Sequence, residues 1–294
     1  MDYQRIKKQA RYQANKILWN VKPEMALKIW FRRAMHQDLN LEDPQSFNEK
    51  IQWMKLNDST PLKGQLSDKL LVRDYVEERV GDQVLLPVLG IWDNPEDIDF
   101  DALPEKFALK ASHGSGFNII VTDKSRINRK EIIEKLKFWL SLDFSYEAFE
   151  MHYQYNHPRV FAEPYLDGFE SGDLIDYKVF HFNNGPDIIE VMRDRSSGRL
   201  KVAYYDENWE PVDLHRNDQP RTFDCPRPHF LQEMLDYSAK LAEEFSFVRV
   251  DWYETNNKLY FGEMTFTPAA GIFKFEDEKY DRWLGSRIIL PVEY

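Results

Sequence analysis

The chain has 294 residues, of which 43% are hydrophobic and 15% aromatic, enough for a core in one large domain or two ordinary ones. The net charge of −11 argues against a general nucleic-acid-binding protein, and no run of about 18 apolar residues predicts a membrane span. The single cysteine, Cys225, excludes an internal disulfide, and residues 1–5 lack the apolar core of a secretory signal, so we expect a cytoplasmic protein.

Positive charge is concentrated at the N-terminal end of the chain. Residues 1–37 contain nine Lys/Arg and two acidic residues, a net charge of +7, so the remaining residues carry −18. We favour the interpretation that these cations lie on a solvated helix face. The alternative is that they contact an anionic membrane surface or an acidic partner, which would make a cytoplasmic protein membrane-peripheral.

Helical patterns dominate the beginning of the chain. Residues 3–36 show apolar side chains at helical spacing and predict two helices interrupted near Pro23. Ser46-Phe47-Asn48-Glu49 is a capping-box sequence and predicts a helix that continues through Leu56. A further helix is predicted from Ser67 to Val80, where Gly81 ends it.

Strand patterns dominate after residue 84, with helices predicted at 129–142 and 228–244. The last two strands flank Thr255-Asn256-Asn257, a turn sequence typical of a β-hairpin. The predicted strands are 84–89, 107–111, 118–121, 160–163, 177–182, 188–192, 201–205, 248–253 and 258–264.

Carboxylates meet on the final hairpin. Residues two apart on a strand share a face, so Arg249 points with Asp251, and Glu263 points with Thr265. Strand pairing can set Asp251 beside Glu263, and two adjacent carboxylates favour a bridging cation. Oxygen ligands suit Mg²⁺, which completes its shell with water and phosphate oxygens. The hairpin therefore predicts a magnesium site, with a surface cluster of salt bridges as the alternative.

A glycine-containing loop follows Lys110. His113-Gly114-Ser115-Gly116 joins two predicted strands, and glycines allow backbone N–H groups to approach a phosphate closely. The loop is not a P-loop, because it leads into a strand and contains no Gly-Lys-Ser/Thr. Lys110 at the end of the entering strand favours a phosphate site over a simple hairpin turn.

Charged residues also recur on the middle strands. Asp176 and Lys178 share a strand face, Arg193 ends a later strand, and Glu163-Pro164-Tyr165-Leu166 closes an earlier one. Cations and carboxylates directed one way from several strands indicate a functional surface. The alternative is the solvated face of an antiparallel sheet.

Shorter patterns point to other functions. Asp99-Phe100-Asp101 resembles the Asp-x-Asp sequence of glycosyltransferases and would mark a nucleotide-sugar site. The spacing of His113, His152 and His157 fits no zinc pattern. No Gly-x-Ser-x-Gly occurs, so serine hydrolase chemistry has no support.

In chain order, these pieces resemble the ATP-grasp superfamily and, more closely, the TupA-like ATP-grasp family of polysaccharide and teichuronopeptide assembly. The closer resemblance extends from about Ser46 to the C-terminus. It rests on residues 47–53, 68–69, 109–116, 176–178 and 247–251.

The resemblance implies an α+β ATP-grasp fold with two α+β subdomains that clasp ATP. The first would cover residues 61–162 and the second residues 163–294, after a helical region at 1–60.

The resemblance also implies where ATP would bind. Lys69 and Lys110 would hold its phosphates, and the loop at 113–116 would cover them as a flap. Glu163 to Leu166 would form the adenine hinge, in which Pro164 contributes only its carbonyl group, and Asp176 would bind the ribose.

The metal and catalytic roles follow from the same resemblance. Asp251 and Glu263 would hold Mg²⁺ together with Thr265, which stands where the family usually has asparagine and makes a second metal ion less expected. Arg249 would stabilise the transferring phosphoryl group or the tetrahedral intermediate. Lys178 and Arg193 are further candidates for contact with a phosphate or an acyl phosphate.

These roles imply an ATP-dependent carboxylate–amine ligase that forms an amide through an acyl phosphate. Expected substrates are an amine or amino acid and a carboxylate such as a uronic acid or a nucleotide sugar, in capsule or surface polysaccharide biosynthesis. A glycosyltransferase of the same pathway, a non-catalytic scaffold and an ATP-grasp kinase are the alternatives. The aromatic stretch 144–157 is predicted to be core, with sugar stacking as the other interpretation.

Overall fold

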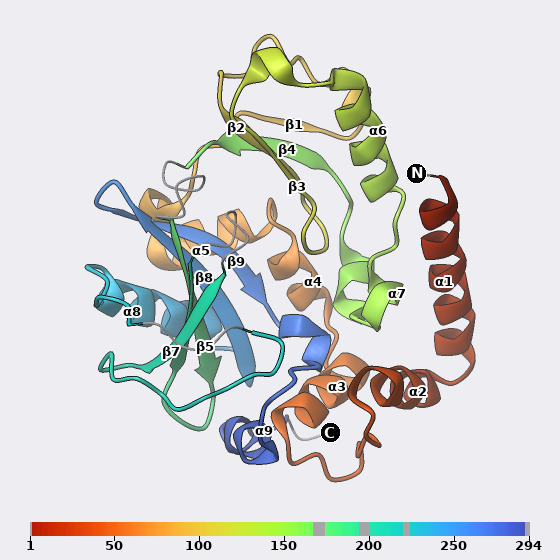
Figure 1. The fold of residues 1–294 in the computed structure, drawn as a ribbon, viewed down its shortest axis with the longest axis vertical. Coiled ribbons are helices and arrows are strands. Elements are labelled where there is room, and N and C mark those ends of the chain that lie inside the picture. Colours follow the sequence, from red (N-terminus) through yellow and green to blue (C-terminus); the bar gives the residue numbers. More distant parts are fainter. Residues whose placement is uncertain (1, 167–173, 194–199, 220–223, 292–294) are drawn as a thin grey trace.

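Two antiparallel sheets organise the chain, and helices pack around each of them (Figure 1). The computed structural model describes residues 2–166, 174–193, 200–219 and 224–291. The smaller sheet has the strand order β1-β4-β2-β3, and the larger sheet has the order β7-β6-β5-β8-β9. Antiparallel sheets combined with separately placed helices confirm the expected α+β fold.

The elements have the following bounds. The strands are β1 (Gly90–Trp92), β2 (Phe107–Ala111), β3 (Asn118–Val121), β4 (Val160–Pro164), β5 (Ile175–Phe182), β6 (Ile188–Arg193), β7 (Lys201–Asp206), β8 (Phe247–Thr255) and β9 (Lys258–Thr265). The helices are α1 (Asp2–Val21), α2 (Pro23–Met35), α3 (Phe47–Asn57), α4 (Pro61–Ser67), α5 (Val72–Val80), α6 (Arg129–Leu140), α7 (Ser145–Ala148), α8 (Leu231–Ala242) and α9 (Glu278–Gly285).

Helices α1 and α2 form an N-terminal arm, and their separation at Pro23 confirms the predicted break. The arm is held to α7 by polar contacts: the Tyr12 hydroxyl bonds to Glu147, and Asn15 Nδ2 donates to the Tyr146 carbonyl at 2.7 Å. Arg11 lies 2.7 Å from the same Glu147 carboxylate, so part of the N-terminal positive charge binds the arm to the body. Among the described residues, no helix combines the length and apolarity needed to cross a bilayer.

Helix α3 begins as the sequence predicts. The Glu49 N–H donates to Ser46 Oγ at 3.2 Å, and the Ser46 N–H donates to Glu49 Oε2 at 3.0 Å, which confirms the capping box. Phe47 is fully buried, and its ring meets those of Phe180 and Phe247 from the larger sheet. Helix α3 therefore belongs to the hydrophobic core on one face of the larger sheet.

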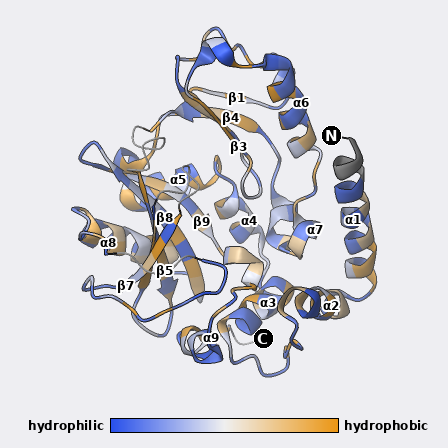
Figure 2. Ribbon diagram, in the orientation of Figure 1, coloured by the Kyte–Doolittle hydropathy of each residue, from blue (hydrophilic) through white to orange (hydrophobic). Residues whose placement is uncertain are grey.

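The smaller sheet has its own core. Strands β2 and β3 form the hairpin predicted at 107–111 and 118–121, and β4 pairs with β2 on the other side. Ile132, Leu136 and Trp139 of α6 pack against this sheet. Figure 2 shows the hydrophilic and hydrophobic residues of α6 side by side, as an amphipathic covering helix requires.

The prediction of a strand at residues 84–89 is wrong. A 3₁₀ turn covers Asp82–Val84, and the first strand begins only at Gly90. Val84 and Leu86 are buried, so most of the apolar run packs into the core, and at its end the Leu89 N–H donates to the Ala162 carbonyl of β4 at 2.8 Å. Pro87 lacks the N–H that a ladder would use.

Only the second part of the helix predicted from Ser67 to Val80 is helical, as α5, because α4 ends at Ser67 and a turn separates the two helices. Asp68 Oδ1 accepts hydrogen bonds from the N–H groups of Leu70 and Leu71 at 2.8 and 3.1 Å, which closes a turn between α4 and α5. Lys69 therefore lies in a turn and not on a helix.

The larger sheet is covered differently on its two faces. Its back face, which carries Val179 and Val250, packs on α5 and α8. Its front face carries Phe180 and Phe182 at one end, where they pack against α3 and α9. The other end of the front face carries the charged residues described below.

The predicted partition at residues 60 and 162 stays a prediction, and packing crosses both boundaries. Strand β4 of the smaller sheet extends through Pro164. Helix α5, placed by sequence in the first subdomain, lies in the core of the larger sheet. The larger sheet thus draws its covering helices from three parts of the chain.

Candidate functional site

A row of polar side chains crosses the front face of the larger sheet. Residues directly opposite each other on antiparallel strands share a face, so the members of this row point to one side. Charges of this kind are costly to bury unless they are paired, and most of the row is buried. From β7 to β9, the polar row consists of Tyr204, Glu190, Lys178, Asp251 and Glu263.

The hairpin of β8 and β9 has one extra residue beside this row. Asn256 and Asn257 form its turn with φ values of 52° and 55°. Asp251 pairs with Glu263, whereas the next pair toward the turn omits Gly262, which forms a β-bulge. A Cβ at Gly262 would lie 3.0 Å from the Asp251 carbonyl oxygen, so glycine suits this close approach. The predicted pairing of Asp251 with Glu263 is confirmed.

Arg249 bridges the two carboxylates. Its Nε and Nη2 donate to Asp251 at 2.6 and 2.7 Å, and Nη2 also lies 3.2 Å from Glu263 Oε1 and 3.1 Å from Thr265 Oγ1. Burial opposes ionisation of Glu263, but the cations of Lys69 and Arg249 lower the pKa of its carboxyl to about 2. Glu263 therefore stays ionised at physiological pH.

Lys178 is buried between two carboxylates. Its Nζ lies 2.6 Å from Asp176 Oδ2 and 2.5 Å from Asp251 Oδ2. Burial alone would lower the pKa of Lys178, but Asp176 and Asp251 raise it. Asp176 Oδ1 is buried and has no hydrogen-bond partner among the described residues, so it can accept a hydrogen bond from a ligand.

The glycine loop at 113–116 lies at the end of the β2–β3 hairpin, which points toward the larger sheet (Figure 1). Lys69 Nζ donates to the Gly114 carbonyl at 2.8 Å and lies 3.4 Å from Glu263 Oε2. Gly114 and Gly116 have φ values of 70° and 74°, a left-handed conformation that favours glycine. Lys69 thus connects the loop of one sheet with a carboxylate of the other.

Lys110 and Glu163 form an ion pair between neighbouring strands. Lys110 Nζ lies 2.5 Å from Glu163 Oε2, and Arg73 of α5 lies 4.0 Å from Glu163 Oε1. The residue predicted to hold phosphate and the residue predicted to begin the adenine hinge therefore lie together. Tyr165 and Leu166 continue from the end of β4 and are half-buried.

Arg193 does not join this cluster. Glu190 lies opposite Lys178 on the front face, so alternation directs Arg193, three residues later, to the back face. There its charge acts on Tyr177 and Cys225, which belong to the back-face core. The expectation that Arg193 contacts an acyl phosphate beside Lys178 overlooked this alternation.

Asp99 and Asp101 are engaged in local contacts. Asp99 Oδ1 accepts from the Asp101 N–H at 3.0 Å, and Asp101 pairs with Arg129 at 2.5 Å. Within the described parts of the chain, no group of three or more His, Cys, Asp or Glu is arranged to hold a metal ion. The Asp99 and Asp101 carboxylates are thus both engaged by neighbouring groups of the protein.

The three histidines considered for zinc differ in their burial and surroundings. His113 and His152 are buried, and desolvation lowers their pKa values to about 4 and about 3. His157 is exposed beside Asp93, at 3.3 Å. In the aromatic stretch, Phe144 and Phe149 are buried, so the core interpretation holds for them.

The carboxylates of the polar row fit a magnesium ion that shares its shell with phosphate. Asp251 is buried, and its oxygens contact Arg249 and Lys178 at 2.5–2.7 Å. Glu263 is 31% exposed and makes longer contacts of 3.2–3.4 Å, so it is the more accessible of the two carboxylates. Mg²⁺ commonly takes one or two protein carboxylates and completes its shell with phosphate and water. The donor set fits that arrangement and not an all-protein cage.

Several residues at this site had not been singled out from sequence. Glu190 and Tyr204 extend the polar row, and Arg216 reaches it from the segment after β7, with Nη1 3.5 Å from Glu190 Oε1. Glu190 carried a usable signal, because it interrupts an otherwise apolar strand. Arg216 lies outside the helices and strands, so no sequence pattern indicated its place at the site.

Comparisons with known proteins give a family match and several solved structures of limited similarity. A model of the TupA-like ATP-grasp family matches residues 49–289. A D-alanine–D-alanine ligase from Helicobacter pylori is 16% identical with a TM-score of 0.44, and the match covers 76% of this chain and 59% of that one. The corresponding enzyme from Bacillus anthracis is 17% identical with a TM-score of 0.40, over 76% of this chain and 66% of that one.

The ATP-grasp ligase PsnB, solved with Mg and ADP, is 11% identical with a TM-score of 0.38, over 74% of this chain and 57% of that one. This chain spans less than two thirds of the length of each of these proteins. A comparison with curated proteins found no match. Because the family model covers most of the sequence, the chain belongs to the TupA-like ATP-grasp family.

Proposed function

We propose that the protein is an ATP-dependent carboxylate–amine ligase that forms an amide through an acyl phosphate. The observation that carries the proposal is the cluster in which Lys69, Lys178 and Arg249 surround the carboxylates of the polar row. Fixed cations beside ligands for Mg²⁺ suit a transferring phosphoryl group, because they stabilise charge without reorganising. Membership of an ATP-grasp family supports ATP as the phosphoryl donor.

In this proposal, ATP binds between the two sheets. Lys69 and Lys110 contact its phosphates beneath the loop at 113–116, and the segment 163–166 contacts adenine. The unpartnered Oδ1 of Asp176 supports a hydrogen bond from a ribose hydroxyl. Magnesium, held by Glu263 and Asp251 with Thr265 beside them, would neutralise charge between the phosphates and the acceptor.

The two chemical steps balance without a further reactant. A substrate carboxylate oxygen bonds to the γ-phosphorus, and ADP leaves. The amine then attacks the acyl carbon, the C–N bond forms and the C–O bond to phosphate breaks. Of the two protons that the ammonium nitrogen gives up, one goes to the departing phosphate and one to solvent. Arg249 and Lys178 stabilise the negative charge of the transferring phosphoryl group and of the tetrahedral intermediate.

We assign the substrates by class. The amine is an amino acid or a related amine, and the carboxylate belongs to a uronic acid or a related sugar acid. The resemblance to a family of polysaccharide and teichuronopeptide assembly supports a role in capsule or surface polysaccharide biosynthesis, in the cytoplasm, where ATP is supplied.

The N-terminal arm supports a contact with an anionic membrane surface in the same proposal. Ile17 and Val21, near the elbow between α1 and α2, are 67% and 71% exposed, and Met25 is 44% exposed. Lys22 lies between them in the sequence. Exposed apolar side chains among cations are typical of segments that bind the surface of anionic membranes.

A product assay tests the ligase. Purified protein is incubated with Mg-ATP, a pool of amino acids and a pool of uronic acids, and ADP, phosphate and an amide mass are the expected products. A stable phosphorylated product would indicate a kinase, and binding of a nucleotide sugar without ATP would indicate a glycosyltransferase. ATP binding without any turnover across these pools would favour a scaffold.

Two variants test the placement of the metal site. Asp251→Asn and Glu263→Gln should abolish turnover, because each removes charge from the pair that would hold magnesium. Circular dichroism should show an unchanged fold. Asp101→Asn, at an exposed carboxylate outside the polar row, is the matched control and should retain activity. Full activity in both site variants would show that the metal site lies elsewhere.

A further inference from the structure

Two fully buried polar side chains, those of Asp68 and Ser112, adjoin the lysine that connects the two sheets. Asp68 precedes Lys69 in the turn between α4 and α5, and Ser112 precedes the loop at 113–116. The Ser112 hydroxyl donates to Asp68 Oδ2 at 2.9 Å. A buried hydrogen bond therefore joins the turn that carries Lys69 to the base of the glycine loop.

The two oxygens of Asp68 have different partners. Oδ1 closes the turn, because it accepts from the N–H groups of Leu70 and Leu71, whereas Oδ2 accepts from Ser112. A neutral asparagine or serine could close such a turn, and a buried carboxylate is the costlier choice. What the carboxylate adds is a second acceptor, directed at the base of the loop.

Lys69 is bonded to the same stretch of chain through its backbone and its side chain. Its N–H donates to the Ser112 carbonyl at 2.9 Å, and its Nζ donates to the Gly114 carbonyl at 2.8 Å. Ser112 is fixed in turn by Arg159, next to β4: the Ser112 N–H donates to the Arg159 carbonyl at 2.8 Å, and Ser112 Oγ accepts from the Arg159 N–H at 3.2 Å. Ser112 thus sets Lys69 against the smaller sheet.

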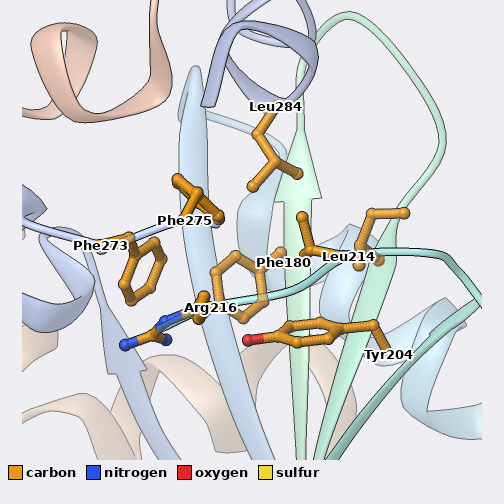
Figure 3. Close-up of a pocket in the computed structure, with 8 residues that line it drawn as sticks. Phe180, Tyr204, Leu214, Arg216, Phe273, Phe275 and Leu284 are labelled. Carbon is orange, nitrogen blue, oxygen red and sulfur yellow. The ribbon is translucent and has the colours of Figure 1, made fainter. Parts of the chain in front are cut away.

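The Lys69 ammonium keeps a donor for an anionic ligand. An ammonium has three N–H donors, and its contacts within the described residues are the Gly114 carbonyl and, at 3.4 Å, Glu263 Oε2. Arg216, at the other end of the polar row (Figure 3), is bound by both oxygens of Asp218 at 2.9 and 2.7 Å. The Lys69 side chain is 19% exposed and that of Arg216 is 7% exposed, so a phosphate can reach Lys69 more readily.

We propose that Asp68 and Ser112 are positioning residues, which hold Lys69 against the loop at 113–116 so that its ammonium meets the phosphates of ATP. The proposal rests on the ligase function proposed above, which assigns those phosphates to Lys69. A lysine side chain loses rotamer freedom when a ligand orders it, and a backbone that is fixed beforehand reduces the total cost of ordering.

Nucleotide binding by the full-length protein tests the proposal. In calorimetric titration with Mg-AMP-PNP, Ser112→Ala and Asp68→Ala should each weaken binding about fivefold or more, because each removes a hydrogen bond that fixes Lys69. Asp68→Asn should bind more tightly than Asp68→Ala, since its amide can still accept from the turn and donate to Ser112 Oγ.

Ser67→Ala is the matched control. Ser67 is also buried and also precedes the turn, but its hydroxyl donates to the Gly64 carbonyl within α4, at 2.9 Å. This variant should bind AMP-PNP as the wild type does. Urea unfolding shows that each variant is folded under the conditions of the titration. If Ser112→Ala does not fold, Ser112→Cys replaces it, because a thiol fills the same space but donates weakly.

A double-mutant cycle separates positioning from general support of the fold. Lys69→Met should weaken AMP-PNP binding about tenfold or more, because it removes a charge-assisted hydrogen bond. Ser112→Ala added to Lys69→Met should weaken binding no further, since Ser112 acts through Lys69. A purely structural role predicts the same loss of affinity with and without Lys69.

Lysine acetylation measures the placement of Lys69 without nucleotide. The protein is treated with a limiting amount of acetic anhydride, and acetylation of Lys69 is read by mass spectrometry relative to exposed Lys240. Acetylation of Lys69 should rise in Ser112→Ala and stay at the wild-type level in Ser67→Ala, because only the first variant releases the turn.

The outcomes separate this inference from the ligase proposal. Unchanged acetylation of Lys69 in Ser112→Ala overturns the inference, as does wild-type AMP-PNP affinity in Ser112→Ala or in Lys69→Met. An equal loss of affinity from Ser112→Ala in both backgrounds overturns it as well. Failure of the wild type to bind AMP-PNP would instead contradict the ligase proposal, while acetylation would still decide whether Ser112 positions Lys69.

Discussion

The charged side chains at this site form ion pairs of opposite sign, and these pairs shift the pKa values of their members. Each carboxylate touches at least one cation at 3.4 Å or less, and Arg249 and Lys178 each touch two carboxylates. A ligand that brings negative phosphate must therefore also bring a cation or displace a carboxylate from its partner. The cluster consists of Lys69, Lys178, Arg249, Asp176, Asp251 and Glu263.

Glu263→Gln should change how stability depends on pH. Burial alone would raise the pKa of the Glu263 carboxyl, but the cations of Lys69 and Arg249 lower it from 4.5 to about 2 in the folded state. A depressed folded-state pKa stabilises the fold above the unfolded-state pKa, and this contribution is lost as pH falls from about 4.5 toward 2. Urea unfolding should show the wild type losing more free energy of unfolding between about pH 5 and pH 3 than the variant. Equal losses would contradict the assigned pKa.

Side chains on the strands could be placed from the sequence, because their positions follow from strand alternation. The two-residue period placed Arg249 with Asp251, Glu263 with Thr265, and Asp176 with Lys178, and the predicted pairing of Asp251 with Glu263 is confirmed. Arg193 was misplaced, although its odd distance from Glu190 predicts the opposite face. The position of Arg216 could not be predicted from the sequence, because a long-range contact made by an irregular segment leaves no periodic signal.

At the scale of elements, helix α3 holds a strained loop in place. Ala269, Ala270 and Gly271 of the 3₁₀ segment Pro268–Gly271 have φ values of 48°, 54° and 69°. Left-handed alanine costs about 1–2 kcal/mol, so surrounding contacts must maintain it. Gln52 Nε2 donates to the Ala270 and Gly271 carbonyls at 3.0 and 2.7 Å. The loop that follows β9 is therefore fixed from α3.

Gly271→Ala should destabilise the protein more than Gly116→Ala. Both glycines have positive φ, so both substitutions carry the backbone cost of about 1–2 kcal/mol. A Cβ at Gly271 would also lie 2.5 Å from Gln52 Nε2 and 2.6 Å from Ile51 Cγ2, whereas a Cβ at Gly116 would meet nothing within 4 Å. Urea unfolding of the two variants measures the difference. Equal destabilisation would show that the packing around Gly271 yields easily.

The elements that sequence predicted best carry local signals. The Asn256–Asn257 turn and the Ser46 capping box depend only on neighbours in the chain, and both are confirmed. Strand β1 was missed because its three residues gain their order from pairing with β4, far away in sequence. The run at 84–89 was misread because burial in a core and membership of a strand select the same apolar residues.

At the scale of the whole molecule, one small contact spans the two sheets near the proposed reaction centre. Lys69, in the turn between α4 and α5, contacts both the Gly114 carbonyl of the smaller sheet's hairpin and Glu263 of the larger sheet. The arm of α1 and α2 lies apart from this centre, on the side of α7 (Figure 1). A membrane contact through the arm would therefore lie away from the residues proposed to bind ATP.

Ile17→Asp should weaken binding to anionic vesicles. The side chain is 67% exposed in the basic arm, and a carboxylate there opposes both insertion and attraction to anionic lipid. Cosedimentation with vesicles of anionic and of neutral lipid at low salt measures the effect. Ile289→Asp, at an isoleucine that is 57% exposed elsewhere on the molecule, is the matched control and should bind as the wild type does. Equal binding by both variants would remove the arm from the proposed contact.

The bulge at Gly262 shifts the alternation of inward and outward side chains along β9 by one residue. Buried Phe261 and Met264 are three residues apart instead of two, and Glu263 faces the polar row only because of that offset. Regular pairing at Gly262 would turn Glu263 into the apolar back face and bring Met264 outward. Burial of Phe261 and Met264 on the back face therefore requires Glu263 to lie on the front face.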